Sequence, residues 1–174
     1  PQGLLVVNAD LCTGCQRCEI NCTLTIETRL SQVSGADGNN KLLTAVIKAA
    51  NLYISNDSTG AAEAIADVDV SSLPVEEAKT LYNTISGATM MNAANDLYNR
   101  GMTAYNKADY TTAADLLVRA YKCDKTKADA VFYAAKSYVA LNQPDNAKKY
   151  YQIIADEFKS SGYVTEAQAY VQSH

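Results

Sequence analysis

Histidine is almost absent from this chain, since its one histidine is the last residue, His174. Imidazole is a common general base at neutral pH and a frequent zinc ligand, so a histidine-dependent enzyme and His-ligated zinc are both disfavoured. Tryptophan is absent too, and no apolar run approaches the roughly 18 residues that a membrane-spanning helix needs. We therefore expect no membrane span. The opening residues, PQGLLVVNAD, also lack the basic start of a signal peptide.

An excess of basic charge is also missing. The 174 residues include 15 Lys and Arg against 19 Asp and Glu, which gives a formal net charge of −4. Nucleic acid and anionic membrane surfaces are therefore not expected as partners. There is no Gly-rich phosphate loop and no nucleophile elbow, so we expect a binding protein or electron carrier rather than an enzyme. At 48% apolar and 20% charged residues, the chain has the composition of a folded globular protein.

The residues that are present divide the chain into two unlike parts. Four of the five cysteines lie between positions 12 and 22, whereas all twelve tyrosines and both phenylalanines lie at or after Tyr53. Between them, residues 31–40 read SQVSGADGNN, a composition typical of a turn-rich linker. The sequence therefore predicts a Cys-rich segment over residues 1–30, a linker over residues 31–40 and a second domain over residues 41–174.

Helical periodicity dominates the second domain. Apolar residues recur at spacings of three and four from position 41 onward, without the strict alternation that marks strands. We expect a first helix that ends in the polar SNDSTG stretch, a short helix over about residues 59–68 and a third from Pro74 to near Gly87. Glu76 and Glu77 would stabilise the start of the third helix. The predicted fold class is mainly α.

Residues 94–127 and 128–161 form an internal repeat of two adjoining copies, in which position 94 aligns with position 128. Six core positions then agree in character, as listed here: Leu97 with Val131, Gly101 with Ala135, Ala104 with Tyr138, Ala113 with Ala147, Leu117 with Tyr151 and Ala120 with Ile154. Small side chains at four of these positions would let the two helices of each copy cross closely. Asp109 and Thr126 are expected N-caps. Residues 162–173 would add a terminal helix.

This repeat resembles the tetratricopeptide repeat (TPR). The family's pattern of small and large apolar positions matches Leu97, Gly101, Tyr105, Ala113, Leu117 and Ala120. The resemblance implies a solenoid of helix pairs over about residues 41–173, with residues 41–89 forming two degenerate pairs. It also implies a concave groove that binds a protein or peptide and performs no chemistry. Carried over from the family pattern, the groove residues are Asn95, Tyr98, Met102, Tyr105, Asp129, Phe132, Lys136 and Val139.

Two further points qualify the groove. The Lys/Asn clamp by which some family members bind a partner's C-terminal carboxylate is not evident, since Tyr98 and Met102 occupy the positions expected for it in the first repeat. Aromatic residues at helical spacing are also common in cores. The alternative is that Tyr98, Tyr105 and Phe132 pack between repeats.

The Cys-rich segment carries a separate motif. Cys12, Cys15, Cys18 and Cys22 have the spacing C-x₂-C-x₂-C-x₃-C. Residues 3–30 thus resemble half of a bacterial [4Fe–4S] ferredoxin, which implies that these four thiolates hold an iron–sulfur cluster. Zinc and an empty or oxidised site are the alternatives. Cys123 is expected to be a lone, semi-buried thiol.

Half a ferredoxin has a consequence for assembly. Thr23 replaces the proline that follows the fourth cysteine in ferredoxins, and no second cysteine quartet is present. Either Cys22 folds back onto the same cluster, or two chains pair as a homodimer that exchanges the fourth ligand.

Three functional hypotheses follow. The chain is a non-catalytic interaction scaffold of the TPR type that can hold a cluster, or an electron-transfer protein whose repeats dock the redox partner. The third is an engineered or misassigned fusion in which the cysteine segment has no function. A cluster favours the reducing cytoplasm, whereas a repeat domain without one would also suit an extracytoplasmic location.

Overall fold

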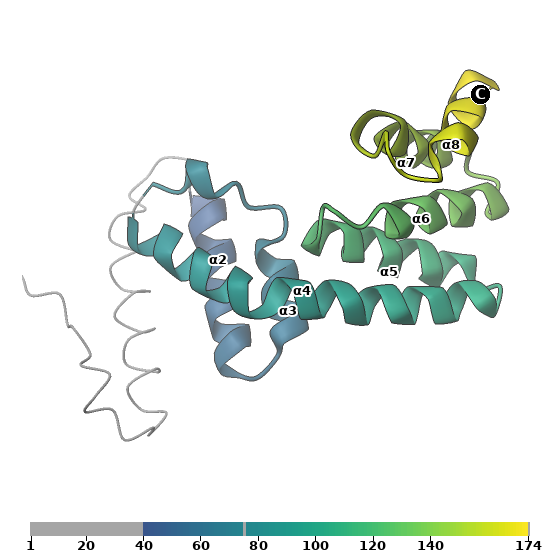
Figure 1. Ribbon diagram of the computed structural model, residues 1–174. Helices are drawn as coiled ribbons and strands as arrows, with labels where there is room; N and C mark the ends of the chain where they lie inside the picture. Colours follow the sequence, from purple (N-terminus) through teal and green to yellow (C-terminus); the bar gives the residue numbers. More distant parts are fainter. Residues whose placement is uncertain (1–39, 75, 174) are drawn as a thin grey trace, which may run out of the picture.

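The computed structural model describes residues 40–74 and 76–173, and this part of the chain is mainly α-helical, without strands (Figure 1). The predicted mainly α fold class is thereby confirmed. The predicted Cys-rich segment, with Cys12, Cys15, Cys18 and Cys22, lies outside the described residues, as does most of the linker. The helices are α2 (Asn40–Ile54), α3 (Ser58–Ile65), α4 (Glu76–Asn106), α5 (Tyr110–Cys123), α6 (Ala128–Ala140), α7 (Pro144–Glu157) and α8 (Val164–Ser173), with a short 3-10 helix, η2 (Val70–Ser72).

Most predicted helix positions agree with these bounds. The first, second and terminal helices are present as α2, α3 and α8, and Glu76 and Glu77 do form the first turn of α4. In the residues that the structure describes, no helix combines the length and the apolar character needed to cross a membrane.

The predicted end of the third helix near Gly87 is wrong. Helix α4 continues without interruption for 31 residues, from Glu76 to Asn106. A glycine inside a helix costs about 1 kcal/mol relative to alanine but does not end it. No proline lies between Pro74 and Pro144, so nothing in this stretch forces the backbone out of the helix.

Helix α4 buries different sides along its length. Ile85 is buried in the first half and Leu97 in the second, and at 3.6 residues per turn these positions differ by about a third of a turn. The first half packs against α2 and α3, and the second against α5. Because no single apolar stripe runs along the whole helix, the sequence pattern looked like two helices. Met90 lies where the two halves meet and packs against both cores.

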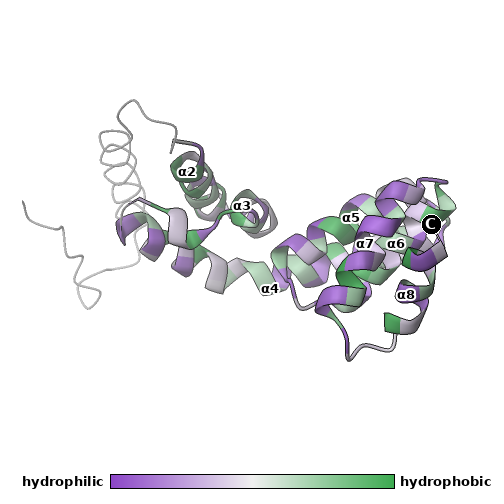
Figure 2. Ribbon diagram, turned by 90° about the horizontal axis from the view of Figure 1, so that it is seen from above, coloured by the Kyte–Doolittle hydropathy of each residue, from purple (hydrophilic) through white to green (hydrophobic). Residues whose placement is uncertain are grey.

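Two hydrophobic cores result. The N-terminal core is aliphatic and joins α2, α3 and the first half of α4, with Leu43, Val46, Ile65, Leu73 and Ile85 among its buried residues. The C-terminal core joins the second half of α4 to helices α5–α8 and adds aromatic rings to aliphatic side chains, including Leu97, Leu117, Tyr121, Val131, Phe132, Tyr151 and Ile154. Figure 2 shows α4 running between the α2–α3 pair at one end and the remaining helices at the other.

From α4 to α8, each helix packs against the next one in sequence, which gives a stack of helix pairs consistent with an α-solenoid-like fold (Figure 1). The register of the repeat appears in the backbone of the turns within the pairs. Ala108 and Asn142, which are equivalent positions of the two copies, both have left-handed φ angles, 60° and 57°. The next amide donates to a carbonyl five positions earlier in both turns: Asp109 to Ala104 at 3.0 Å and Gln143 to Tyr138 at 2.9 Å.

The turn between α2 and α3 has the same form. Asn56 has a φ of 62°, and the Asp57 amide donates to the Leu52 carbonyl at 2.9 Å. Helices α2 and α3 therefore form one helix pair, followed by η2 and the first half of α4. The expectation of two degenerate pairs over residues 41–89 is wrong, because α4 continues into the next pair instead of ending.

The paired core positions of the repeat are buried in both copies, except that Tyr138 is half-buried. At Gly101, a Cβ would lie 2.8 Å from the Leu117 Cγ, so the close crossing of α4 and α5 requires glycine there. Asp109 is an N-cap, as predicted: its carboxylate accepts from the Thr112 amide at 3.2 Å. Thr126 is not one, because Asp124 accepts from its amide at 3.0 Å and the N-cap position falls to Lys127.

Candidate functional site: the face of α4 and α6

The eight predicted groove residues divide evenly between α4 and α6, and they differ in exposure. Asn95 is exposed, and Val139 has 43% of its surface exposed. Phe132 is buried, with 6% exposed. The other five are half-buried: Tyr98, Met102, Tyr105, Asp129 and Lys136.

Tyr98 and Asp129 join the two helices across this face. Burial of Tyr98, together with the charge of Asp129 and a hydrogen bond to its carboxylate, raises the pKa of Tyr98 to about 12. The Lys127 Nζ lies 5.4 Å from the centroid of the Tyr98 ring. The phenol is therefore a neutral hydrogen-bond donor at physiological pH, held between an acidic and a basic neighbour.

Phe132 is covered by a ring that the sequence analysis did not assign to this face. Tyr163, from the connection between α7 and α8, stacks on Phe132 with centroids 4.2 Å apart and an interplanar angle of 15°. The Lys136 Nζ also lies 5.2 Å from the centroid of the Phe132 ring, and 3.5 Å from the Glu166 Oε1. Phe132 thus packs within the chain, and its ring offers little surface to a partner. Tyr163 lies one repeat length after Asp129, so the repeat register was the signal that could have found it.

Tyr105 and Met102 retain part of their surface. The Tyr105 ring makes edge contacts with Tyr110 at 5.5 Å and Tyr133 at 5.2 Å, which hold its orientation. Met102 packs partly against the C-terminal core. The accessible part of the face therefore comprises Val139 on α6 and a strip on α4. The strip is made of Asn95, Tyr98, Met102 and Tyr105, which share one side of the helix at spacings of three and four.

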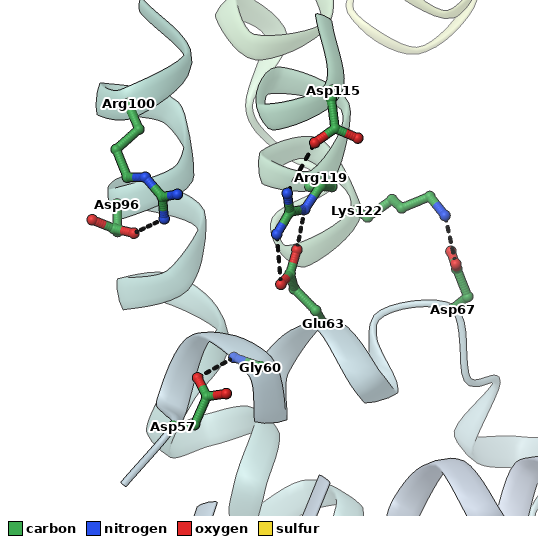
Figure 3. A network of polar contacts seen from close by, with 9 residues as sticks. All are labelled: Asp57, Gly60, Glu63, Asp67, Asp96, Arg100, Asp115, Arg119 and Lys122. Carbon is green, nitrogen blue, oxygen red and sulfur yellow. Dashed lines mark hydrogen bonds and ion pairs between the residues drawn. The ribbon is translucent and has the colours of Figure 1, made fainter. Parts of the chain in front are cut away.

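A polar cluster connects α3 with α5, which are the second helices of their pairs (Figure 3). The Arg119 guanidinium donates to both carboxylate oxygens of Glu63, and to the Asp115 Oδ2 at 2.9 Å. These hydrogen bonds raise the pKa of Arg119 above its ordinary value. Lys122 and Asp67 form a second ion pair at 2.6 Å.

Four residues of this cluster also line a small recess together with Ala66, namely Glu63, Asp67, Arg119 and Lys122. Its cations and carboxylates are engaged with one another. The cluster is therefore a cross-link between the two cores.

Metal-binding groups are not found in the part of the chain that the structure describes: no three His, Cys, Asp or Glu side chains converge there to hold an ion. Cys123 is 7% exposed, and burial raises the pKa of its thiol to about 11. A protonated, buried thiol is a poor metal ligand and a poor nucleophile.

Comparison of the chain with protein-family models, with curated proteins and with solved structures finds no match.

Proposed function

We propose that this chain is a non-catalytic protein-binding module of the TPR type, which binds a peptide segment of a partner protein on the face of α4 and α6. The observation that carries the proposal is the repeat register, present in the core positions and again in the turns at Ala108 and Asn142. Stacked helix pairs of this kind present the first helix of each pair on one side, where segments of other proteins can bind.

The side chains of this face support a peptide ligand. Tyr98, Met102 and Tyr105 combine apolar surface with a phenol hydroxyl, and Tyr and Met are enriched at protein interfaces. Asn95 adds a side-chain amide that can pair with a peptide backbone. The carboxylate of Asp129 and the ammonium of Lys127 both lie beside Tyr98, which favours a partner segment without strong net charge.

The test is a selection of peptides from a displayed library on the immobilised full chain, followed by calorimetry with the selected peptides. We expect Met102→Glu to abolish binding, since it places a charge among apolar contacts. Thr103→Glu is the matched control, because Thr103 is the exposed neighbour outside the strip and should bind as the wild type does. If no peptide is selected, or if both variants bind equally, the proposal fails.

A second function is proposed for the N-terminal segment, on the cysteine spacing alone. Cys12, Cys15, Cys18 and Cys22 supply the four thiolates that a [4Fe–4S] cluster takes, and a bound cluster would carry one electron at a time. In that case the helical domain would select the redox partner and the cluster would give the protein a role in electron transfer. Without the cluster, the repeat face would be the functional surface.

Anaerobic purification with iron and sulfide assays tests this second function. We expect about four irons per chain and a broad absorbance band near 400 nm, both lost in Cys15→Ala. Cys123→Ala is the control and should keep the iron, because Cys123 is buried in the C-terminal core. A metal-free wild type would refute the cluster and leave the peptide-binding proposal untouched.

A further inference from the structure

The first half of α4 carries an exposed face without charge. Residues 80–95 contain no Asp, Glu, Lys or Arg. Met91 lies on this stretch with 72% of its surface exposed, more than Tyr53 at 40% or Val139 at 43%. Depletion of charge together with an accessible methionine is typical of the centre of a protein interface.

Gly87 lies one helical turn before Met91, on the same side of α4. Among the residues that the structure describes, no neighbouring atom comes within 4 Å of the position that a Cβ would occupy there. Packing within the chain therefore does not require glycine, although a helical glycine costs about 1 kcal/mol relative to alanine. Gly87 contrasts with Gly101, where Leu117 leaves no room for a Cβ. The exposed face thus has a protruding side chain at Met91 and open space one turn earlier.

We propose that two copies of this chain associate through this face, with their α4 helices antiparallel and Met91 of each copy over Gly87 of the other. A two-fold interface requires that residue i contacts residue j and that j contacts i. A protrusion and a gap one turn apart on one helix meet this requirement. The absence of charge matters as well, because a two-fold axis would place any central charge opposite its own copy.

The ends of the contact are complementary in charge. In the first turn of α4, Glu76 is paired with Lys79 at 2.7 Å and Glu77 is exposed. An antiparallel arrangement centred between Gly87 and Met91 brings this turn to within about one helical turn of Tyr98 of the other copy. There the Lys127 ammonium lies 5.4 Å from the Tyr98 ring, while the Asp129 carboxylate is engaged by the Tyr98 hydroxyl. The Glu77 carboxylate of one copy therefore approaches a basic group of the other.

This association depends neither on a peptide partner nor on the cysteine segment, so it can be measured on the full chain alone. Sedimentation equilibrium is run in reducing buffer with a chelator, which removes disulfide and metal links between chains. We expect the mass to rise with concentration from 18.7 kDa towards twice that value. A single-chain mass up to submillimolar concentration would overturn the proposal.

Two variants locate the contact. Met91→Glu should weaken dimerisation by about tenfold or more, because an uncompensated carboxylate would be buried on each side of the axis. Gly87→Ala should also weaken dimerisation by filling the open space, yet raise the thermal midpoint because alanine favours the helix. A Gly87→Ala variant that disturbed the fold would instead lower both the dimer affinity and the thermal midpoint.

Tyr53→Glu is the control, since it changes an exposed apolar residue on another helix and should dimerise as the wild type does. A dimer that withstands both α4 variants, or one lost only in Tyr53→Glu, would place the interface elsewhere and overturn the proposal.

Discussion

The N-terminal and C-terminal cores share helix α4 but are filled by different side chains. Tyr82 is the one ring that packs against the N-terminal core among the described residues, and it is only partly buried. In the C-terminal core, rings meet rings: every aromatic pair within residues 40–74 and 76–173 involves positions at or after Tyr105. Most of these pairs are edge-on, and three are stacked or tilted.

The difference shows how spacing between helix pairs is held. Aromatic pairs prefer particular angles and separations, so they fix how one helix lies on the next. An aliphatic core needs mainly the right volume and tolerates rearrangement. The turns at Ala108 and Asn142 keep the repeat register, whereas Asn56 precedes Ala108 by well over one repeat length. The 34-residue spacing of the turns is thus kept in the part of the chain that holds the aromatic core.

The largest effect is expected from Phe132, at the centre of the ring contacts. Phe132→Ala should destabilise the chain by about 3–5 kcal/mol. Phe132→Leu should still cost more than Ile65→Leu in the N-terminal core, which should lose less than about 1.5 kcal/mol. Urea unfolding followed by circular dichroism measures all three. Equal losses for the two leucine variants would refute the contrast between the cores.

Overpacking at Gly101 comes next. Gly101→Val should cost about 1–3 kcal/mol, because the added side chain meets Leu117 and separates α4 from α5. Gly87→Ala is the matched change in the other half of the helix and should stabilise the monomer by about 1 kcal/mol. Thermal unfolding at low protein concentration distinguishes the expected loss of stability in Gly101→Val from the expected gain in Gly87→Ala. A neutral Gly101→Val would mean that the crossing can widen freely.

The ion pair between Glu63 and Arg119 links the two cores and should contribute less. Both side chains are partly exposed, so a double-mutant cycle with Glu63→Gln and Arg119→Met should give a coupling energy of up to about 1 kcal/mol. The exposed pair of Asp96 and Arg100 within α4 is the control, expected at about 0.3–0.5 kcal/mol. High salt should reduce the control more strongly. A coupling below that of the control would show that the cross-link contributes nothing to joining the cores.

A smaller effect, here an increase in stability, is expected at the turn between α4 and α5. Ala108 is exposed and adopts a left-handed φ of 60°, which disfavours residues with a Cβ. Ala108→Gly should therefore stabilise the chain by about 0.4–1 kcal/mol. Asn142→Gly, at the equivalent turn, should gain less because asparagine tolerates this conformation. Chemical denaturation detects both, and a loss of stability in Ala108→Gly would contradict the account of these turns.

The smallest effect is expected in the pH dependence of stability, at alkaline pH. The pKa of Tyr98 is raised from 10.0 to about 12 in the folded chain, so the unfolded chain loses this proton first. Stability should therefore fall as the pH rises from about 10 towards 12. Thermal midpoints measured between pH 8 and pH 11 should fall less steeply in Tyr98→Phe. Parallel pH dependences would show that Tyr98 ionises as easily in the folded chain as in the unfolded one.

The sequence predicted the helices well where a single apolar stripe keeps the same direction along the whole helix. Helices α2, α5 and α8 have such a stripe, and the alignment of Leu97 with Val131 and of Gly101 with Ala135 identified positions that are buried. Prediction failed in α4, because periodicity alone cannot distinguish a helix that ends from one whose buried side changes.

The details of the candidate site were less accessible to sequence reasoning. A turn is capped by whichever side chain reaches the free amides, and Asp124 rather than Thr126 does so between α5 and α6. The burial of Phe132 depends on Tyr163, which is distant in sequence and reaches the ring through the connection before α8. The cysteine motif remains a prediction, since it lies outside the residues that the structure describes.

The shared helix α4 also bears on how the chain folds. The contacts from α4 to α8 join sequence neighbours, so the entropy lost in closing each loop is small and folding should be fast. In a row of independent pairs, one end could unravel while the other stayed intact. Here a helix about 46 Å long belongs to both ends, and Met90 contacts both cores. Loss of either core would leave half of α4 without support, so we expect one cooperative transition.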